Sequence, residues 1–397
     1  MDFDPPEAVR PLLDKISKFV DEHIIPVERE VLENGWNASD AILKDLRKKC
    51  QAAGMWGPQI PHELGGLGLG LVEHGLVSER LGRSPLGHYT FGCQAPDAGN
   101  LEILHKYGTP EQKARYLEPL AKGEIRSCFS MTEPENPGSN PTLMSTQAVK
   151  RGDDYIIDGH KWFTSSADGA TFAIVMAVTN PEAQAHGRAS MIIVPTDAPG
   201  FERVRNIKIM GDAGDGWASH SEIWYRGVKV PQANRLGPEG AGFLIAQERL
   251  GPGRIHHCMR WIGICERVFD TMCRHITHRK IDDEKTLATR QIAQAWVAEA
   301  RADIDASRLM VLHASWTIEK KGFQVARDQV SAIKFFVADV MMRLIDRAVQ
   351  LHGALGISSD TVLGHYYVHE RGARIYDGPD EVHKMVLAKR ILARYQQ

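Results

Sequence analysis

The sequence predicts an α+β protein of three consecutive domains: a helical domain over residues 1–128, an antiparallel β domain over 129–239, and a four-helix bundle over 240–397. In the first third, apolar residues recur at the spacing of amphipathic helices. The middle third holds short β-branched and aromatic runs separated by Gly, Pro and Asn. Long helical periodicity returns in the last third, so the chain reads as helices, then a sheet, then helices.

Composition bounds the class of protein. The chain has 397 residues, 43% hydrophobic and 25% charged, which suits a globular protein with several domains and a large buried core. The net charge of -2 gives no electrostatic feature for binding nucleic acid or an anionic membrane. No apolar run approaches the roughly 18 residues of a membrane span.

The cysteines and the first residues indicate a compartment. Six cysteines are scattered without a C-x-x-C pair, which is typical of free thiols in a reducing environment. The first seven residues lack both the basic-then-apolar pattern of a secretion signal and the Arg-rich pattern of a transit peptide. These observations favour the cytoplasm.

The N-terminal third is predicted to be entirely helical. Helical spacing predicts helices over residues 11–34, 41–53, 72–81 and 98–107. Thr109 followed by Pro110 reads as an N-cap with proline at the first helical position. The glycine-rich stretch 61–70 is not a phosphate-binding loop, because no Lys-Ser or Lys-Thr follows it, and a loop before a helix is the interpretation we favour.

The middle third changes character at residues 129–142. Its prolines and glycine exclude a helix, while Ser, Thr and Asn place hydroxyls and amides in a loop. Asp158-Gly159 lies between two apolar runs and predicts a β-hairpin. Further strands are predicted over residues 173–178, 190–194, 222–225 and 227–231. Together they predict a small antiparallel barrel.

The C-terminal third is predicted to be a bundle that ends in an acidic loop. Sustained periodicity predicts helices over 297–317 and 333–349, the second ending in the small residues of 350–356. Residues 374–384 then combine Tyr376, three carboxylates and a Gly-Pro turn. Taken alone, this loop favours a solvated acidic turn.

Histidine spacing predicts no metal site. His365 and His369 are four residues apart and His275 and His278 are three apart, but neither pair matches His-Glu-x-x-His. No cysteine or third ligand is spaced to complete a metal site.

Four motifs in this order resemble those of the acyl-CoA dehydrogenase family over essentially the whole chain. Residues 132–140 resemble Thr-Glu-Pro-x-Ala-Gly-Ser-Asp, with Asn140 in place of Asp, and residues 161–164 resemble Lys-x-Trp-Ile-Thr. Residues 350–356 resemble Gln-x-x-Gly-Gly-x-Gly, and residues 376–381 resemble Tyr-Glu-Gly-Thr-x-Glu. Each motif alone is weak, but four at compatible separations are specific.

Within the family, residues 250–260 and 377–383 resemble the branch of acyl-CoA dehydrogenase family members 10 and 11. The larger animal members of that branch also carry a kinase-like domain, so this chain resembles their dehydrogenase part. The branch suggests 4-hydroxyacyl-CoAs or related chains among the possible substrates.

The resemblance implies FAD-dependent α,β-dehydrogenation of an acyl-CoA to a 2-enoyl-CoA in fatty-acid or hydroxy-fatty-acid catabolism. A base takes the α proton while the β hydrogen leaves as hydride to flavin N5. Asp377 matches the family's glutamate base, whereas the position that carries the base in some relatives is Gly253, which has no side chain. Asp377 is therefore the implied catalytic base, shorter than glutamate by roughly 1.5 Å. Rigidity imposed by Pro379 is a hypothetical compensation.

The family's binding residues carry over by position. The implied FAD contacts are Met131, Thr132, Ser139, Trp162, Thr164, Arg279, Gln350, Gly353, Gly356 and Glu381. The implied substrate contacts are Ser139, Arg254, Tyr376 and Gly378. Asp380 is expected to face solvent. The segment after Arg279 lacks the family's aromatic residue and glycine.

The resemblance also implies partners. Gln350, Gly353 and Gly356 would hold the FAD of a neighbouring subunit, which implies a homodimer or homotetramer. Electron-transferring flavoprotein is the implied electron acceptor.

Two other functions stay open at this point. An acyl-CoA oxidase or flavin monooxygenase of the same fold would require oxygen access. A catalytically silent acyl-CoA-binding scaffold is suggested by Asp377 in place of glutamate and Pro379 in place of threonine. Bleaching of a bound flavin by acyl-CoA would exclude the scaffold, and fast reoxidation by air would favour an oxidase.

Overall fold

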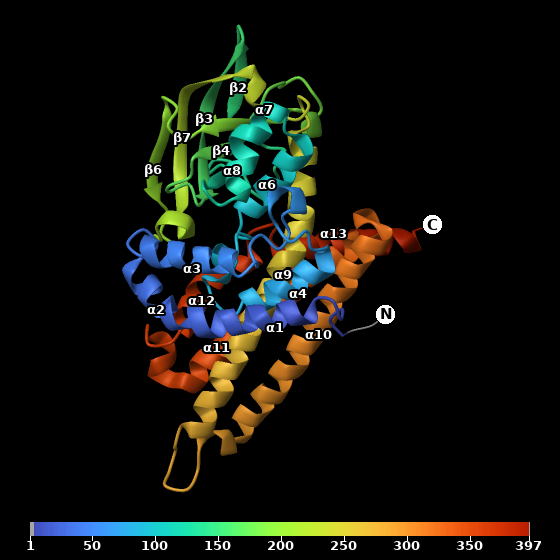
Figure 1. Ribbon diagram of the computed structural model, residues 1–397. Coiled ribbons are helices and arrows are strands. Elements are labelled where there is room, and N and C mark those ends of the chain that lie inside the picture. The colour runs from blue at the N-terminus through green and yellow to red at the C-terminus, as the bar shows by residue number, and fades with distance from the viewer. Residues whose placement is uncertain (1–3, 397) are drawn as a thin grey trace. The chain divides into compact units, whose positions relative to one another are not determined.

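The computed structural model describes residues 4–396, except for the side chains of residues 250–252, where the 250–260 motif begins. The chain forms two compact units, each built from segments far apart in sequence, as the colours of Figure 1 show. The helical unit comprises Met1–Glu33, Leu69–Thr90 and Gly251–Gln397; the sheet unit comprises Asn34–Gly68 and Phe91–Leu250. The domain boundaries expected at residues 128 and 239 stay a prediction.

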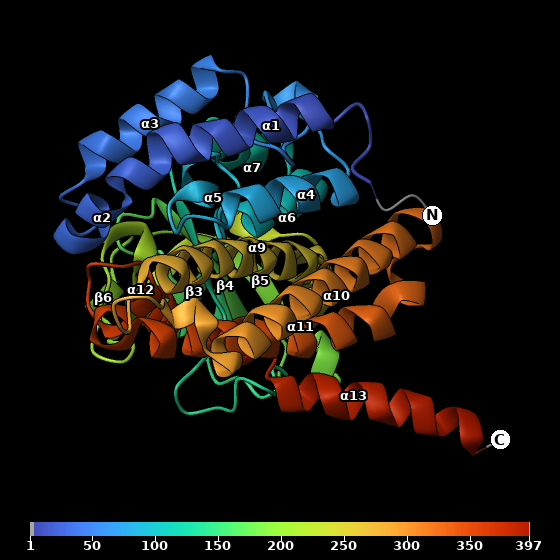
Figure 2. The same ribbon diagram turned by 90° about the horizontal axis from the view of Figure 1, so that it is seen from below.

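The helical unit contains long antiparallel helices with short helices packed on them. Its elements are α1 (Arg10–Phe19), α2 (Ile25–Asn34), α4 (Leu71–Leu81), α5 (Gly87–Thr90), α9 (Gly242–His278, from residue 251), α10 (Gln291–Lys321), α11 (Phe323–His352), α12 (Leu363–His369) and α13 (Asp380–Leu392). Figure 2 shows α1 alongside α4, and α11 with α10 and α13 as neighbours. The predicted 11–34 helix is interrupted by a π-helical turn at Val20–Ile24.

The predicted periodicity of the bundle is confirmed by burial. On α11, Ile333, Val337, Leu344 and Ile345 are all almost completely buried, three and four residues apart along one face. The chain turns between α10 and α11 at Gly322, whose φ of 84° lies in the left-handed region that glycine adopts at little cost. This turn brings the two helices into antiparallel contact.

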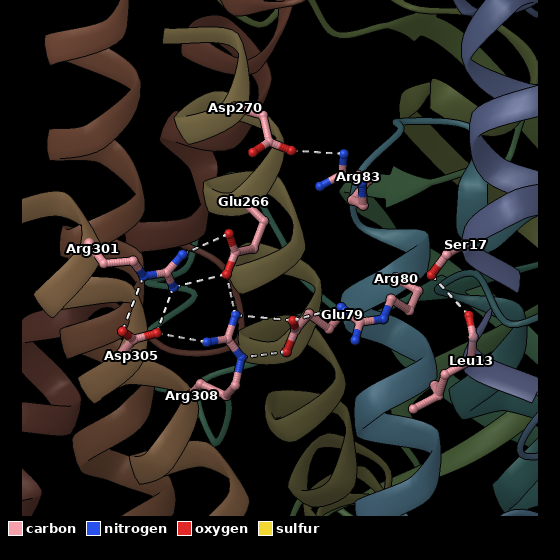
Figure 3. Close-up of polar contacts among 10 residues, drawn as sticks. All are labelled: Leu13, Ser17, Glu79, Arg80, Arg83, Glu266, Asp270, Arg301, Asp305 and Arg308. Atoms are coloured by element: carbon pink, nitrogen blue, oxygen red, sulfur yellow. Dashed lines mark hydrogen bonds and ion pairs between the residues drawn. The ribbon is translucent and has the colours of Figure 1, made fainter. Parts of the chain in front are cut away.

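A charged network ties three helices of this unit together (Figure 3). Arg308 on α10 donates Nε to Glu79 on α4 at 3.0 Å and also pairs with Glu266 on α9. Arg301, two turns earlier on α10, reaches the same Glu266 at 2.9 Å. Although burial alone would raise the pKa of Glu266, hydrogen bonds from the two arginines hold it below its ordinary value. The network is therefore ionised at neutral pH.

The sheet unit holds eight strands in one open sheet. The strands are β1 (Ser127–Ser130), β2 (Gln147–Arg151), β3 (Asp154–Ser165), β4 (Phe172–Val178), β5 (Ala189–Pro195), β6 (Phe201–Asn206), β7 (His220–Pro231) and β8 (Arg235–Leu236). Their order is β6-β7-β3-β2-β4-β5-β8, with β1 beside β4. The predicted order of helices, sheet and helices is confirmed, but the sheet is not closed into a barrel. It is also not purely antiparallel, because β1 and β2 pair with β4 in parallel.

Alternate residues of β4 serve two cores in the sheet unit. Phe172 and Ile174 face a cluster that includes Leu101 and Leu104 of α6 (Asp97–Tyr107). Ala173 and Val175 face the other side, with Tyr155 and Ile157 of β3. The remaining helices of this unit are α3 (Asp40–Ala52), α7 (Pro110–Gln112) and α8 (Glu118–Ala121). The predicted cap at Thr109 is confirmed, because its hydroxyl accepts the Gln112 N–H at 3.3 Å.

The predicted hairpin at Asp158-Gly159 is wrong. These residues lie inside β3, where the register with β7 shifts in a β-bulge. A side chain at Gly159 would meet Thr146 Oγ1 at 2.3 Å, so glycine here serves a close approach rather than a turn. The actual hairpin joins β2 to β3 through Gly152, whose φ is 58°.

The described part of the chain was also compared with what a membrane span and a metal site require. Among residues 4–396, no helix combines the length and the apolar character needed to cross a membrane. Within the same described part of the chain, His, Cys, Asp and Glu side chains form no group of three or more that could hold a metal ion.

The charged network gives a first prediction. Arg308→Met removes the cation that pairs with two largely buried glutamates. We expect the free energy of unfolding to fall by roughly 2–3 kcal/mol, because Arg308 is partly exposed but its partners stay charged. Urea denaturation measures this change. Arg29→Met breaks exposed pairs with Glu33 and Asp360 and is the control, with no measurable shift expected. Equal midpoints for both variants would contradict the prediction.

Candidate active site

The loop after β1 is held by a buried ion pair. Lys161 Nζ donates to the carbonyl of Met131 at 2.7 Å and to Glu133 Oε1 at 2.9 Å, and neither charged side chain is exposed by more than 3%. Trp162 donates its backbone N–H to the carbonyl of Thr132 at 3.0 Å. Strand β3 therefore positions the segment that carries Met131 and Thr132.

Glu133 is a second anchor of the same loop. It accepts the backbone N–H groups of Ser145 and Thr146 at 2.6 and 2.8 Å. Although burial alone would raise it, the Lys161 ammonium and these hydrogen bonds hold the pKa of Glu133 at about 2. Burial lowers the pKa of Lys161 to about 8, so both groups carry charge at neutral pH. The sequence motifs contained both residues without assigning them this role.

Trp162 and Thr164 lie at an irregular part of β3. The register shifts between Lys161 and Thr164, and the intervening Phe163 has a φ of 47°. Trp162 Nε1 is buried and has no hydrogen-bond acceptor among the residues that the structure describes. Thr164 is fully buried and its hydroxyl lies 3.1 Å from that of Ser130. An unpartnered buried donor fits a site for a ligand with acceptor atoms.

Ser139 lies apart from these contacts, on the exposed end of the 131–140 loop. Nearer the strand, a side chain at Gly138 would lie 3.2 Å from the methyl group of Thr132, so the loop folds back over Thr132. The sheet unit thus brings together Met131, Thr132, Trp162 and Thr164.

In the helical unit, the backbone at Asp377 has an uncommon conformation. Asp377 has a φ of 54° and Gly378 a φ of 100°, both in the left-handed half of the map. The carbonyl of Asp377 accepts Nε of Arg254 at 3.2 Å and lies 3.1 Å from Nε2 of His383. Burial lowers the pKa of His383 to about 4, so its neutral ring donates Nε2–H to this carbonyl. Two donors from α9 and α13 thus hold the turn.

The Asp377 side chain has a partner of its own. Its Oδ2 lies 3.1 Å from Nε2 of His257 on α9, and the two side chains are 21% and 23% exposed. Sequence reasoning missed His257, although it stands in the 250–260 motif. Only its spacing of three residues from Arg254, on the same face of α9, signalled the contact.

The preceding residue, Tyr376, is anchored by its hydroxyl. This oxygen accepts Nη2 of Arg260 at 2.9 Å and Nε1 of Trp261 at 3.2 Å. Arg260 is in turn bidentate to Glu370, at 2.5 and 2.8 Å. Burial raises the pKa of Tyr376, so its hydroxyl stays protonated. The phenol therefore works as a fixed support on this side of the loop.

The expectation that Asp380 faces solvent is wrong. Asp380 is 1% exposed, and its carboxylate pairs with Lys334 of α11 at 3.3 Å and with Arg374 at 2.8 Å. It is the first residue of α13, where a carboxylate also suits the helix dipole. The Asp380 carboxylate thus attaches the start of α13 to α11. The next residue, Glu381, is exposed.

The glycines after α11 form a further group. Gly353 ends the helix with a φ of 61°, and its N–H bonds the carbonyl of Gln350. A side chain at Gly356 would lie 2.5 Å from the carbonyl of Val349, so only glycine fits there. His352 stacks on His275 of α9 at 4.0 Å between ring centres, which brings the ends of α9 and α11 together. Gln350 is exposed, and so is Arg279 just beyond α9.

Three consecutive family models match the chain: the N-terminal domain of acyl-CoA dehydrogenase over residues 6–124, the middle domain over 128–223, and the C-terminal domain over 240–392. The chain belongs to the acyl-CoA dehydrogenase family. This confirms the resemblance predicted from the four sequence motifs.

Relatives support the assignment over the whole length. The chain is 41% identical over 392 residues to "Probable acyl-CoA dehydrogenase FadE2" of Mycobacterium tuberculosis, covering 96% of this chain and 94% of the relative. It is 37% identical to acyl-CoA dehydrogenase family member 11 of Rattus norvegicus, over 95% of this chain but only about half (49%) of that relative. It is 38% identical to family member 10 of Mus musculus, over 96% of this chain and 37% of that relative.

Solved structures share the fold. A structure from Mycobacterium abscessus superposes with a TM-score of 0.93 at 38% identity, covering 99% of this chain and 100% of the other. Butyryl-CoA dehydrogenase from Megasphaera elsdenii superposes with a TM-score of 0.86 at 26% identity, with the same coverage. The enzyme class predicted from sequence, an acyl-CoA dehydrogenase, is therefore confirmed.

The left-handed turn of this acyl-CoA dehydrogenase gives a second prediction. Gly378→Ala places a Cβ 2.7 Å from His383 Nε2 in a backbone conformation that costs an alanine about 1–2 kcal/mol. We expect the free energy of unfolding to fall by a similar amount and amide hydrogen exchange to quicken over residues 377–383. Gly364→Ala, which meets only ordinary contacts, is the control. Unchanged exchange in Gly378→Ala would show that the turn tolerates a side chain.

Proposed function

We propose that this protein catalyses the FAD-dependent α,β-dehydrogenation of an acyl-CoA thioester to a 2-enoyl-CoA, with Asp377 as the base that removes the α proton. The family assignment supports the reaction class. The single observation that carries the choice of base is the clamped left-handed turn at Asp377. Residues forced into uncommon backbone conformations occur preferentially at functional sites, because the surrounding structure must hold them there.

The chemistry places two demands on the base. An α proton of a thioester is very weakly acidic, so the carboxylate must be shielded from water and aligned with the C–H bond. Asp377 meets the first demand in part, since its side chain is 21% exposed, and the turn supports the second by fixing the backbone that carries the side chain. Gly253, at the alternative position for a base, offers no group that could accept a proton.

FAD is the cofactor that we propose for the reaction, and when bound it supplies the hydride acceptor at N5. Met131, Thr132, Trp162 and Thr164 would hold its ring system, and the unpartnered Nε1 of Trp162 is a donor suited to it. The residues proposed for its phosphates and adenosine are Ser139, Arg279, Gln350, Gly353, Gly356 and Glu381.

The residues that we propose for the acyl-CoA come from both units. Arg254 and Gly378 flank Asp377, Tyr376 precedes it, and Ser139 belongs to the exposed loop of the sheet unit. Arg254 supports the carbonyl of Asp377 and lies on the first turns of α9 in the helical unit. Its role would be to fix the thioester side of the substrate relative to the base.

Partners follow from the same proposal. A structure titled "Electron transferring flavoprotein of Acidaminococcus fermentans" superposes with a TM-score of 0.86 at 28% identity. We propose electron-transferring flavoprotein as the acceptor of this enzyme's electrons. Because Gln350, Gly353 and Gly356 would bind the FAD of a neighbouring subunit, we also propose a homodimer or homotetramer.

The base assignment gives a third prediction. Asp377→Asn keeps the shape of the side chain but removes its capacity to accept a proton. We expect the FAD content to stay at the wild-type level and the rate of anaerobic flavin bleaching by acyl-CoA to fall about 10²–10⁴-fold. Asp346→Asn, which alters an exposed carboxylate on α11, is the control. Bleaching by Asp377→Asn at the wild-type rate would assign the proton abstraction to another group.

We further propose a hydroxylated acyl chain as the substrate, with a buried pair of histidines in the helical unit as its candidate hydrogen-bond partners. His74 of α4 and His256 of α9 stack at 4.0 Å between ring centres. Both nitrogens of His74, and Nδ1 of His256, are buried and find no hydrogen-bond partner anywhere in the described part of the chain. Burial lowers the pKa of His74 well below its ordinary value, so the ring is neutral and can both donate and accept. A hydroxyl group matches this pair.

The fourth prediction tests that substrate preference. His74→Leu should lower kcat/KM for a 4-hydroxyacyl-CoA about 5-fold relative to the unsubstituted chain of equal length, because about 1 kcal/mol of hydrogen bonding is lost. The unsubstituted substrate is the internal control and should react no more slowly than with the wild type. Steady-state kinetics measures the ratio of kcat/KM for the two substrates. A ratio equal to that of the wild type would contradict the proposed preference for a hydroxylated chain.

A further inference from the structure

We propose that His257 is a positioning residue for Asp377: its Nε2–H fixes the direction of the carboxylate that removes the α proton. The inference rests on the proposed function, because it assigns a role toward the base named there. The carrying observation is the 3.1 Å contact between His257 Nε2 and Asp377 Oδ2. An ionised carboxylate only accepts hydrogen bonds, so Nε2 must carry the hydrogen that it shares with Oδ2.

Different donors contact the backbone carbonyl and the side-chain carboxylate of Asp377. Arg254, whose guanidinium keeps its charge, is directed at the backbone carbonyl of Asp377 at 3.2 Å. His383 also bonds this carbonyl. The carboxylate is thus in contact with the imidazole of His257. A bidentate arginine in its place would stabilise the anion more strongly and make it a weaker base.

The geometry leaves the carboxylate little freedom. The backbone of Asp377 is fixed by two hydrogen bonds to its carbonyl, so the side chain can turn only about its own two bonds. Holding Oδ2 at His257 then fixes the plane of the carboxylate and the direction of Oδ1. Because an aspartate side chain has one rotatable bond fewer than a glutamate, a single contact fixes its carboxylate more completely. For the same reason, the side chain cannot turn to compensate if that contact is lost.

His257 is itself supported by aromatic rings. The ring of Trp261, one turn along α9, lies at 6.0 Å from that of His257 with an angle of 20° between their planes. The ring of Tyr376 lies at 5.4 Å. Trp261 is 1% exposed and donates to the Tyr376 hydroxyl, so the two rings fix each other as well as the imidazole. A side chain held this firmly can impose its position on a partner.

Other charged and titratable groups face Asp377 from every neighbouring element. The groups are Arg254, His257 and Cys258 on α9, Lys334 on α11, His383 on α13, and Tyr376 in the loop. Lys334 is engaged by Asp380, and burial keeps the thiol of Cys258 and the phenol of Tyr376 protonated by raising the pKa of each. His257 reaches the carboxylate group itself, with its Nε2 at 3.1 Å from Oδ2.

Two amide variants separate positioning from mere structure. The amide of glutamine reaches the place of imidazole Nε2, whereas that of asparagine reaches only the place of Nδ1. With FAD bound, we expect His257→Asn to bleach about 10- to 100-fold more slowly than the wild type in single turnovers with acyl-CoA. His257→Gln should recover most of the rate. The dissociation constant for acyl-CoA should stay within about twofold in both variants, because the change concerns alignment rather than binding.

Isotope and pH readouts complete the test. Misalignment slows proton removal, so the α-deuterium isotope effect on bleaching should rise in His257→Asn and return in His257→Gln. The pH profile of the bleaching rate should shift in His257→Asn, since the carboxylate has lost a donor to its charged form. His313→Leu, an exposed change on α10, is the control and should alter neither. Equal rates and isotope effects for His257→Asn and the wild type would overturn the proposal, as would equal impairment of the two amide variants.

The outcome is distinguishable from failure of the proposed function. If Asp377→Asn bleaches normally, the base assignment itself fails. If Asp377→Asn is inactive while His257→Asn is normal, only the role of His257 fails. In the Asp377→Asn background, His257→Asn should cause no further loss, because the two residues act as one unit. An additional independent loss in the double variant would also overturn the positioning role.

Discussion

The turn at Asp377 and Gly378 is the constraint on which the helical part of the candidate site depends. A left-handed conformation at a residue with a side chain is unfavourable by itself, so it needs partners that exist only in the folded protein. Arg254 and His383 supply them at one carbonyl oxygen, from helices that are far apart in sequence. The position of the carboxylate is therefore a product of the packing of α9 and α13 as much as of the loop sequence.

Buried charge recurs as the means of fixing loops in both units. Lys161 with Glu133 in the sheet unit, and Lys334 with Asp380 in the helical unit, are almost fully buried ion pairs. Such pairs contribute little net stability relative to apolar packing, but breaking one leaves an uncompensated charge. They exclude alternative loop conformations, which is what a binding site needs. In each case a long lysine from a regular element reaches a carboxylate at the start of a loop or helix.

Most of the fold followed from periodicity, and the misses have physical reasons. The helices over 72–81, 98–107 and 333–349 were predictable because their apolar faces are regular. The Asp158-Gly159 hairpin was wrong because a bulge and a turn demand the same residues, and only the neighbouring Thr146 distinguishes them. The burial of Asp380 was missed because one of its two partners, Lys334, is 46 residues away on α11, although the other, Arg374, is only six residues away. The contact of His257 was missed because Asp377 is also distant in sequence, and the spacing of His257 from Arg254 on α9 was the one indication of it.

Asp377 and Pro379, the two residues that depart from the family motif in this loop, act together in fixing its backbone. Pro379 stands at the N-cap of α13 with φ −54° and ψ 149°, so it passes the chain directly from the left-handed turn into a helix. One helical turn later, His383 returns to the carbonyl of Asp377, and its ring also occupies the space that a side chain at Gly378 would need. If Asp377 is the base, as proposed, its shorter side chain needs a rigid backbone beneath it. In this loop Pro379, Gly378 and His383 provide that rigidity together, so neither departure from the family motif is neutral alone.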